Sequence, residues 1–414
     1  MMTYSKTFRC RQMISRSLLL LVLSALPITA PGCQSTPDKT PVASVQPQAS
    51  SSDRDARQEA IRAELEDRYT VGPVSAAKLD YKVNWQFAIP DESVKQLVPA
   101  GKHLFILTHD NDLICIRTHD GLRVWSVSVG KPLDEVLSIL PNEAEGLVIV
   151  LKPSTITTLN ISTGMAEKVT IGKATQSLEW VANTPGVLDG EHLLYGARSG
   201  QLVWQAWRIG FPWRAYQVDH GLRQAPVISS DIVVITGSSG VVKAFNANTA
   251  SQMWRKKLLD NVTTNPVASS DTAYIAGLDQ HLRAFNLFDG NTRWRVLTNT
   301  PLVDSPVLLG DRVYQQIPGQ GLAAFAANPA DDFNGHQYWI NGDIGGNVLT
   351  RNGRSLVVWD DANHVLGTIS TSQGTTDTLL HVPDVVRVIA DDLENGTLFA
   401  LGYDGRLTCL TPSN

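Results

Sequence analysis

The chain has 414 residues, of which 43% are hydrophobic and 18% are charged, as is usual for a folded protein. Its formal net charge is -5, but residues 1–32 contribute four basic side chains and no acid, so the remainder carries 31 basic and 40 acidic residues and a net charge near -9. Because phosphate binding depends on clustered Lys and Arg, this balance argues against a nucleic-acid partner.

The N-terminus is predicted to be an export signal. A basic segment precedes an apolar run over residues 18–26, and the small residues Ala30 and Gly32 follow. The run is too short to span a bilayer. Residues 26–33 (LPITAPGC) resemble the lipobox of bacterial lipoproteins, which implies cleavage after residue 32 and acylation of Cys33, with an ordinary secretory signal as the alternative. Gln34, in place of the Asp that retains lipoproteins at the inner membrane, implies an outer-membrane lipoprotein facing the periplasm.

The segment after the signal is predicted to be a tether followed by a helix. Residues 33–52 are rich in Ser, Pro, Gln and Thr and are too poor in apolar groups to fold. A short helix is expected over residues 53–70, with Asp53 as a candidate N-cap and a thin apolar stripe. We interpret this helix as a spacer on the folded domain, and a partner-binding helix is the alternative.

From Tyr81 onward, the sequence repeats with a period of 40 to 45 residues. Six of its ten tryptophans recur at this period, with one double step of 88 residues in which Lys168 stands in the tryptophan position. The six are Trp85, Trp125, Trp213, Trp254, Trp294 and Trp339.

Two further landmarks fix the register of the repeat. A strand pattern such as VKAF from Val242 or LRAF from Leu282 begins twelve residues before the tryptophan position, and an Asp-Gly or Thr-Gly turn lies between the two. A short inner strand opens with Pro-Val at residues 226, 266 and 306, in steps of 40.

One period therefore contains four short strands, which is typical of a propeller blade. Eight tryptophan positions, the last degenerate near Thr378, predict an all-β, eight-bladed propeller over residues 80–414. The last repeat ends after its third strand, so residues 83–87 are expected to supply its fourth strand and close the ring.

The Pro-Val strand, the AF-type strand, the Gly turn and the tryptophan together resemble the PQQ-like repeat family over about 330 residues. The resemblance implies that the six tryptophans dock neighbouring blades. That fold hosts both enzymes and scaffolds. A dehydrogenase that uses pyrroloquinoline quinone is one alternative, but the cysteines are not adjacent as in many such enzymes, and no matching set of metal-binding carboxylates can be assembled. The four cysteines of the chain are Cys10, Cys33, Cys115 and Cys409.

We therefore predict no catalytic residue, cofactor or metal site. Cys115 and Cys409 occupy the same strand position in the first and last blades, where packing is the favoured interpretation and a disulfide the alternative. His109, His119 and His281 fit polar turn residues better than metal ligands.

Two places depart from the repeat and are candidate partner contacts. The aromatic residues Trp204, Trp207 and Phe211, near Trp213, fall in a blade without a clean AF-type strand. They indicate either an irregular blade core or an exposed anchor for a partner, since aromatic residues dominate interface hot spots. The second place is a five-residue insertion near residues 331–338, which includes Tyr338.

An exported, lipid-anchored propeller of this repeat type is similar to the propeller lipoproteins of outer-membrane β-barrel assembly. That similarity implies a monomeric scaffold whose protein partner is the barrel-forming subunit of the assembly machinery, and whose membrane contact is its lipid anchor. The alternatives are a small-molecule enzyme with its site on the propeller axis and an envelope binding module unrelated to barrel assembly.

Overall fold

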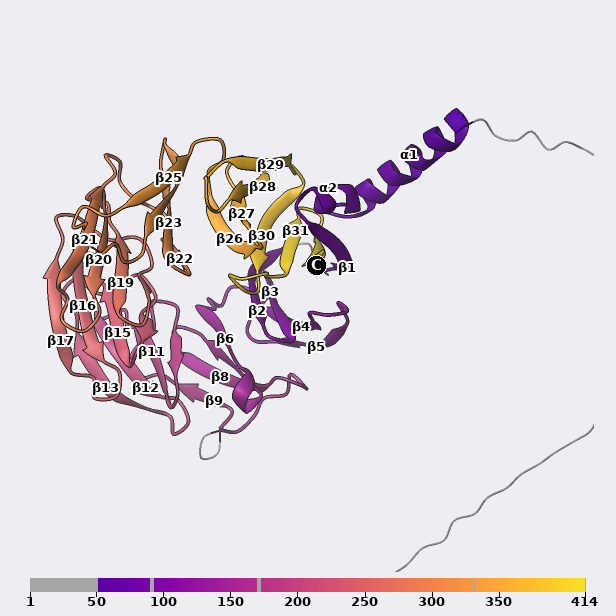
Figure 1. Ribbon diagram of the computed structural model, residues 1–414. Helices are drawn as coiled ribbons and strands as arrows, with labels where there is room; N and C mark the ends of the chain where they lie inside the picture. Colours follow the sequence, from indigo (N-terminus) through magenta and orange to yellow (C-terminus); the bar gives the residue numbers. More distant parts are fainter. Residues whose placement is uncertain (1–50, 90–92, 170–172, 331, 414) are drawn as a thin grey trace, which may run out of the picture. The chain divides into compact units, whose positions relative to one another are not determined.

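The computed structural model describes residues 51–89, 93–169, 173–330 and 332–413 (Figure 1). The predicted signal and Cys33, with most of the predicted tether, lie outside the described residues. The chain divides into two units, Met1–Arg54 and Asp55–Asn414. All the strands belong to the second unit.

Within the second unit, the strands form eight antiparallel four-stranded sheets, which makes the fold an eight-bladed β-propeller as predicted. We number the blades from β2 onward. The first four blades are β2 (Val94–Ala100), β3 (His103–Thr108), β4 (Asp112–Arg117) and β5 (Arg123–Ser128); β6 (Ser138–Asn142), β7 (Leu147–Leu151), β8 (Thr155–Asn160) and β9 (Thr175–Ser177); β10 (Val187–Asp189), β11 (His192–Gly196), β12 (Gln201–Ala206) and β13 (Phe211–Gln217); and β14 (Val227–Ser229), β15 (Ile232–Thr236), β16 (Val241–Asn246) and β17 (Gln252–Lys257).

The fifth to seventh blades follow the same order along the chain, and the eighth takes its outer strand from the start of the domain. They are β18 (Val267–Ala268), β19 (Thr272–Ala276), β20 (His281–Asn286) and β21 (Thr292–Leu297); β22 (Val307–Leu309), β23 (Arg312–Ile317), β24 (Gly321–Ala326) and β25 (Gln337–Asn341); β26 (Asn347–Asn352), β27 (Ser355–Asp360), β28 (Val365–Ser370) and β29 (Thr376–His381); and β30 (Val385–Ala390), β31 (Leu398–Gly402), β32 (Arg406–Pro412) and β1 (Tyr81–Ala88).

Blade 8 closes the ring as the sequence predicts. The outer strand β1 pairs antiparallel with β32, and Trp85 lies opposite Cys409. The same register places Trp254 opposite Ala244 in blade 4. Closure covers the faces of the first and last blades, which an open array of repeats would leave exposed.

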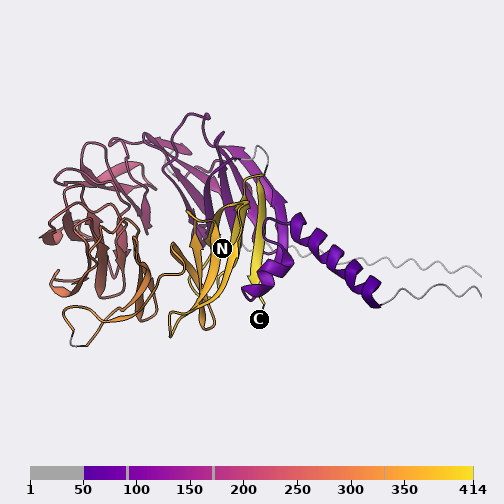
Figure 2. The ribbon, with the colours of Figure 1, turned by 90° about the horizontal axis from the view of Figure 1, so that it is seen from above.

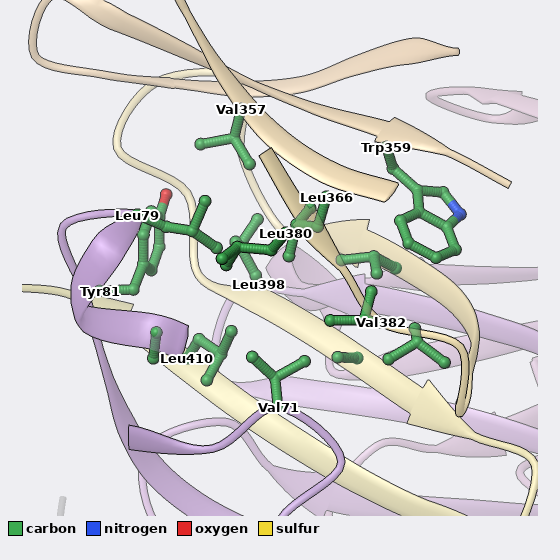
Figure 3. Packing of buried hydrophobic residues seen from close by; sticks show 14 residues of the cluster. Val71, Leu79, Tyr81, Val357, Trp359, Leu366, Leu380, Val382, Leu398 and Leu410 are labelled. Carbon is green, nitrogen blue, oxygen red and sulfur yellow. The ribbon is translucent and has the colours of Figure 1, made fainter. Parts of the chain in front are cut away.

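The strand sequences follow their place in the blade. Most second strands are rich in apolar residues, and those of blades 2, 4, 5 and 8 are buried at every position, because both of their faces pack against neighbouring blades. In the outer strand β17, by contrast, Trp254 is the one buried residue among exposed and half-buried neighbours. Side chains from adjacent blades therefore form separate clusters between the sheets, and Figure 3 shows the one in which Val357, Leu366, Leu398 and Leu410 meet.

Two helices precede β1: α1 (Ser51–Arg68), where a helix over 53–70 was expected, and α2 (Pro73–Lys78), which the sequence reading missed. Because α1 begins at Ser51, the proposed N-cap Asp53 lies inside the helix, and that prediction is wrong. α2 packs beside β1 (Figures 1 and 2). A single-turn 3-10 helix, η1 (Glu143–Glu145), precedes β7. Neither α-helix in the described part of the chain is long and apolar enough to cross a membrane.

The end of α1 is fixed to blade 8 by hydrogen bonds. The guanidinium of Arg406 donates to the carbonyl oxygen of Arg68 at 2.7 Å, which satisfies a carbonyl that the helix end leaves unpaired. The Glu66 carboxylate accepts the backbone N–H groups of Val74 at 2.7 Å and Ser75 at 2.9 Å and so caps α2. From Asp55 to Leu65, the side chains of α1 are exposed, so this stretch of the predicted spacer does not lie on the ring.

Candidate interaction surfaces

The propeller offers two loop faces for contacts. Because the four strands of a blade run antiparallel in sequence, the turns between strands one and two and between strands three and four share one end of each sheet. We call that end the hairpin face. The turns between strands two and three share the other end with the links from blade to blade, and we call that end the connection face. Loops on a rigid scaffold are where binding residues concentrate.

Hydrogen bonds from outer-strand side chains join neighbouring blades. In five blades, the indole Nε1 of the tryptophan donates to a backbone carbonyl oxygen just after the third strand of the next blade, at 2.7–2.9 Å. The pairs are Trp85 to Thr118, Trp125 to Ile161, Trp254 to Leu287, Trp294 to Ala327 and Trp339 to Thr371. Each satisfied indole N–H thereby fixes the position of one blade on the next.

Trp213 does not take this position, which corrects the predicted register of blade 3. Arg214, not Trp213, lies opposite Trp204, and Trp213 is the extra residue of the β-bulge. Trp204, in the third strand β12, takes the place of the missing indole between blades 3 and 4. Its Nε1 donates to the carbonyl oxygen of Ala247 in blade 4 at 3.1 Å. The regular step of 40 residues, counted back from Trp254, reaches Arg214 and not Trp213. The spacing of 41 residues between Trp213 and Trp254 therefore already indicated that Trp213 lies one residue from the repeat position.

Blade 2 has no tryptophan that docks on blade 3. The hairpin after β8 keeps the register of blade 1, since the N–H of Asn160 donates to the carbonyl oxygen of Met165 as that of Arg117 donates to Leu122, but Lys168 is exposed. Lys168 lies outside the short outer strand β9, which begins at Thr175. Within β9, the amide of Gln176 donates to the carbonyl oxygen of Trp207, the equivalent acceptor in blade 3. A glutamine therefore supplies the donor that an indole supplies elsewhere, and the fixed spacing could not locate it because 14 residues separate β8 from β9.

The candidate partner contacts divide into buried and exposed residues. Trp204 and Trp207 are both 0% exposed, so their interpretation as surface anchors is wrong, and they form the irregular core of blade 3. Phe211 and Tyr338 are 48% and 42% exposed. These two aromatic rings remain available to a partner.

Cys115 and Cys409 are both free thiols buried in the blade interior. Burial disfavours the thiolate and raises the pKa of each to about 12. They pack as small apolar side chains. In the described part of the chain, no three His, Cys, Asp or Glu side chains come close enough together to hold a metal ion.

The hairpin face carries exposed apolar side chains at the tips of its third-to-fourth strand turns. One such residue lies between those strands in five of the eight blades, and Met165 is the most exposed, at 71%. The five are Leu122, Met165, Ile209, Phe288 and Phe333.

The connection face carries apolar and charged groups side by side. Leu133 and Leu259, on links between blades, are 99% and 89% exposed. Near blades 3 and 4, the Asp219 carboxylate pairs with Arg255 at 3.1 Å and with the nearly buried Lys243 at 3.8 Å, beside a depression of about 510 Å³. Sequence reading missed this ion-pair cluster, although a lysine inside the apolar third-strand pattern was a signal for it. Exposed apolar groups beside charges are typical of protein contact surfaces.

The insertion in blade 6 forms two adjoining clefts on the hairpin face. Ten residues, 327–336, join β24 to β25, where five join the corresponding strands of blade 5. The turn leans onto blade 5, because the N–H of Arg295 in β21 donates to the carbonyl oxygen of Phe333 at 2.9 Å. The clefts measure about 620 and 180 Å³, and Ala326, Asn328 and Tyr338 line both.

A third cavity lies beside the helical segment. It measures about 410 Å³ and is lined by the end of α1 and the start of α2 together with residues of blades 7 and 8, including His381, Asp384 and Arg406. Since Glu66 and Arg406 already hold the two helices in place, we interpret this cavity as part of their attachment.

These features define a β-propeller of PQQ-like repeats with two loop faces suited to protein contacts, which is a protein-interaction scaffold. The family model described as outer membrane protein assembly factor BamB matches residues 73–186 and 189–414, and the chain belongs to that family.

Two solved structures share the fold. BamB from Moraxella catarrhalis is 16% identical, with a TM-score of 0.61 over 80% of this chain and 97% of that one. A computationally designed protein, Ika8, is 13% identical, with a TM-score of 0.62 over 77% of this chain and 96% of that one. At these identities the likeness establishes the fold alone. No curated protein matches the sequence.

Proposed function

We propose that this protein is a lipid-anchored scaffold facing the periplasm, which holds the barrel-forming subunit of the machinery that assembles outer-membrane β-barrel proteins. The observation that carries the proposal is the family match, which extends over both parts of the ring, residues 73–186 and 189–414. The anchor would be Cys33. We further propose that the protein acts by binding, without catalysis.

The connection face supports this role with a concrete contact surface. Leu259 is almost fully exposed on the link from blade 4 to blade 5. The charged cluster of Asp219, Lys243 and Arg255 lies one link earlier. An apolar contact flanked by charges of both signs gives a partner both buried area and orientation.

The experiment is co-purification of the barrel-forming subunit with Leu259→Glu, with Met165→Glu on the opposite face as the matched control. We expect about a tenfold loss of bound subunit for the first variant, the size of a single contact hot spot, and no loss for the second. Equal recovery with both variants would move the contact away from the connection face. Absence of the subunit from the unsubstituted protein, or a quinone absorbance that purifies with it, would contradict the proposed function itself.

A further inference from the structure

The smaller of the two blade 6 clefts has the size of one side chain. Its volume of about 180 Å³ is below the range of roughly 300–1,000 Å³ in which small-molecule ligands usually bind. Its lining combines the apolar side chains of Leu308, Ala326 and Ala327 and the rings of Tyr274 and Tyr338 with the polar residues Ser269, Asp311 and Asn328. It adjoins the shallower cleft of about 620 Å³, where the backbone of a bound segment would have room.

Tyr338 forms a wall of this cleft that is already ordered. It is the extra residue of the β-bulge in blade 6, since Ala324 pairs with Trp339 and Phe325 with Gln337. The guanidinium carbon of Arg312 lies 4.3 Å from the centre of its ring. The ring of His336 packs against it in a T-shaped arrangement, with 5.0 Å between the ring centroids. A partner side chain would meet this ring at little entropic cost, because the ring is held in place before binding.

One carboxylate, that of Asp311, lines the smaller cleft. The side chain of Asp311 is 81% exposed, and its one ion-pair contact in the described chain is Arg312 Nε at 3.9 Å. Arg312 is itself committed to Tyr338 and to the carbonyl oxygen of Thr371 in blade 7. The nearby Asp271 pairs with Arg293 at 2.9 Å. Among the residues that line the smaller cleft, Asp311 is therefore the carboxylate that can meet a cation from a partner.

We propose that this cleft binds an extended segment of a protein partner through a lysine or arginine side chain. The hydrocarbon stem lies against Tyr338 and Leu308, and the charged end lies beside Asp311, as long cationic side chains do when they pack on apolar surface and keep the charge in water. The site is on the hairpin face, so it is separate from the proposed contact at Leu259. The inference does not depend on the role in barrel assembly.

The test uses the purified mature chain and three labelled ten-residue peptides, acetylated and amidated, with alanine, threonine and valine around the two central positions. Those positions are lysine in the first peptide, norleucine in the second and glutamate in the third. Binding is measured by fluorescence anisotropy. We expect the lysine peptide to bind at least tenfold more tightly than the norleucine peptide, and the glutamate peptide to bind most weakly.

Two variants locate the site and one controls for charge. Asp311→Asn removes the carboxylate at an exposed position, and we expect it to abolish the preference for lysine over norleucine. Tyr338→Ala should weaken the binding of both the lysine peptide and the norleucine peptide. Asp231→Asn is the matched control, because the carbonyl oxygens of Asp231 and Asp311 accept the equivalent backbone hydrogen bonds from Ala247 and Ala327 in blades 4 and 6. It should change nothing.

Equal binding of the three peptides would overturn the proposal, as would no binding at millimolar peptide or a lysine preference that survives Asp311→Asn. Should Tyr338→Ala fail to fold, Asp311→Asn alone still decides the outcome. A negative result here leaves the co-purification with the barrel-forming subunit unaffected, so failure of this inference and failure of the proposed function are distinguishable.

Discussion

Substitution of Trp254 by alanine tests whether the indoles hold the blades together. The side chain is 6% exposed, its Nε1 donates to Leu287 of the next blade at 2.7 Å, and its ring lies 6.2 Å from that of Phe285. Truncation removes the packing of a large ring, at about 3–5 kcal/mol. It also leaves a buried carbonyl oxygen without its partner, which adds about 1 kcal/mol. We therefore expect the free energy of unfolding to fall by about 4–6 kcal/mol.

The assay is equilibrium urea unfolding of the mature chain, followed by tryptophan fluorescence and far-ultraviolet circular dichroism. Trp213→Ala is the matched control, because Trp213 is half-buried in a β-bulge, where its ring contacts His192 at 4.8 Å between the ring centroids. We expect the control to lose less than about 1.5 kcal/mol, since that ring is only partly removed from water. Similar losses for the two variants would refute the reasoning that inter-blade indoles carry the stability.

Three further predictions concern the glycine turns, the buried thiols and, from the lipobox resemblance of the sequence, the lipid anchor. Gly290→Ala should destabilise the fold by about 2 kcal/mol or more, because residue 290 has φ +70° and an added Cβ would lie 2.6 Å from the indole of Trp254 in blade 4. Ala250 occupies the corresponding turn of blade 4 at φ +54°, so Ala250→Gly should be neutral or stabilising by up to about 1 kcal/mol in the same urea assay. Burial raises the pKa of Cys115 and Cys409 from 9.0 to about 12, so their contribution to stability is fully present below pH 9 and is lost as the pH rises from 9 toward 12. Both thiols should resist iodoacetamide at pH 8 until urea unfolds the chain. Rapid labelling of the native protein would contradict their burial. Cys33→Ala should move the protein from the membrane to the soluble fraction, and unchanged fractionation would reject the lipid anchor.

The regular part of the fold could be predicted because each landmark has one physical cause. Pro-Val marks the start of an inner strand, and the Gly turn allows the next hairpin to lie against an indole. In blade 5, an added Cβ at Gly290 would meet the ring of Trp254. Blade 4 carries Ala250 at the corresponding turn because the indole that would press on it is replaced by Trp204, which enters from inside blade 3.

The irregular blades could not be predicted from spacing. In blade 3, a tryptophan lies one residue from the repeat position, and sequence alone could not show that Trp213 is the extra residue of a bulge and that Arg214 takes the register position. In blade 2, the donor moved to Gln176 beyond a longer connection. In both blades a different residue donates the hydrogen bond to the next blade. The bond between neighbouring blades therefore recurs even where the tryptophan does not.

The candidate surfaces were predictable only in part. The insertion in blade 6 and the exposure of Tyr338 followed from the lengthened hairpin. The cleft beneath it depends on Asp311 and Leu308, which the sequence separates from Tyr338 by almost 30 residues. Trp204 and Trp207 were candidate partner contacts, but both are buried. Aromatic residues that break a repeat can fill an irregular core as readily as they form a binding surface.

The most direct test of the scaffold role is mild crosslinking of the native protein in its own membranes, followed by mass spectrometry of the attached proteins and peptides. We expect recovery of the barrel-forming assembly subunit, joined through residues of the connection face. Recovery of unrelated envelope proteins alone would contradict the role in barrel assembly while leaving the eight-bladed propeller intact.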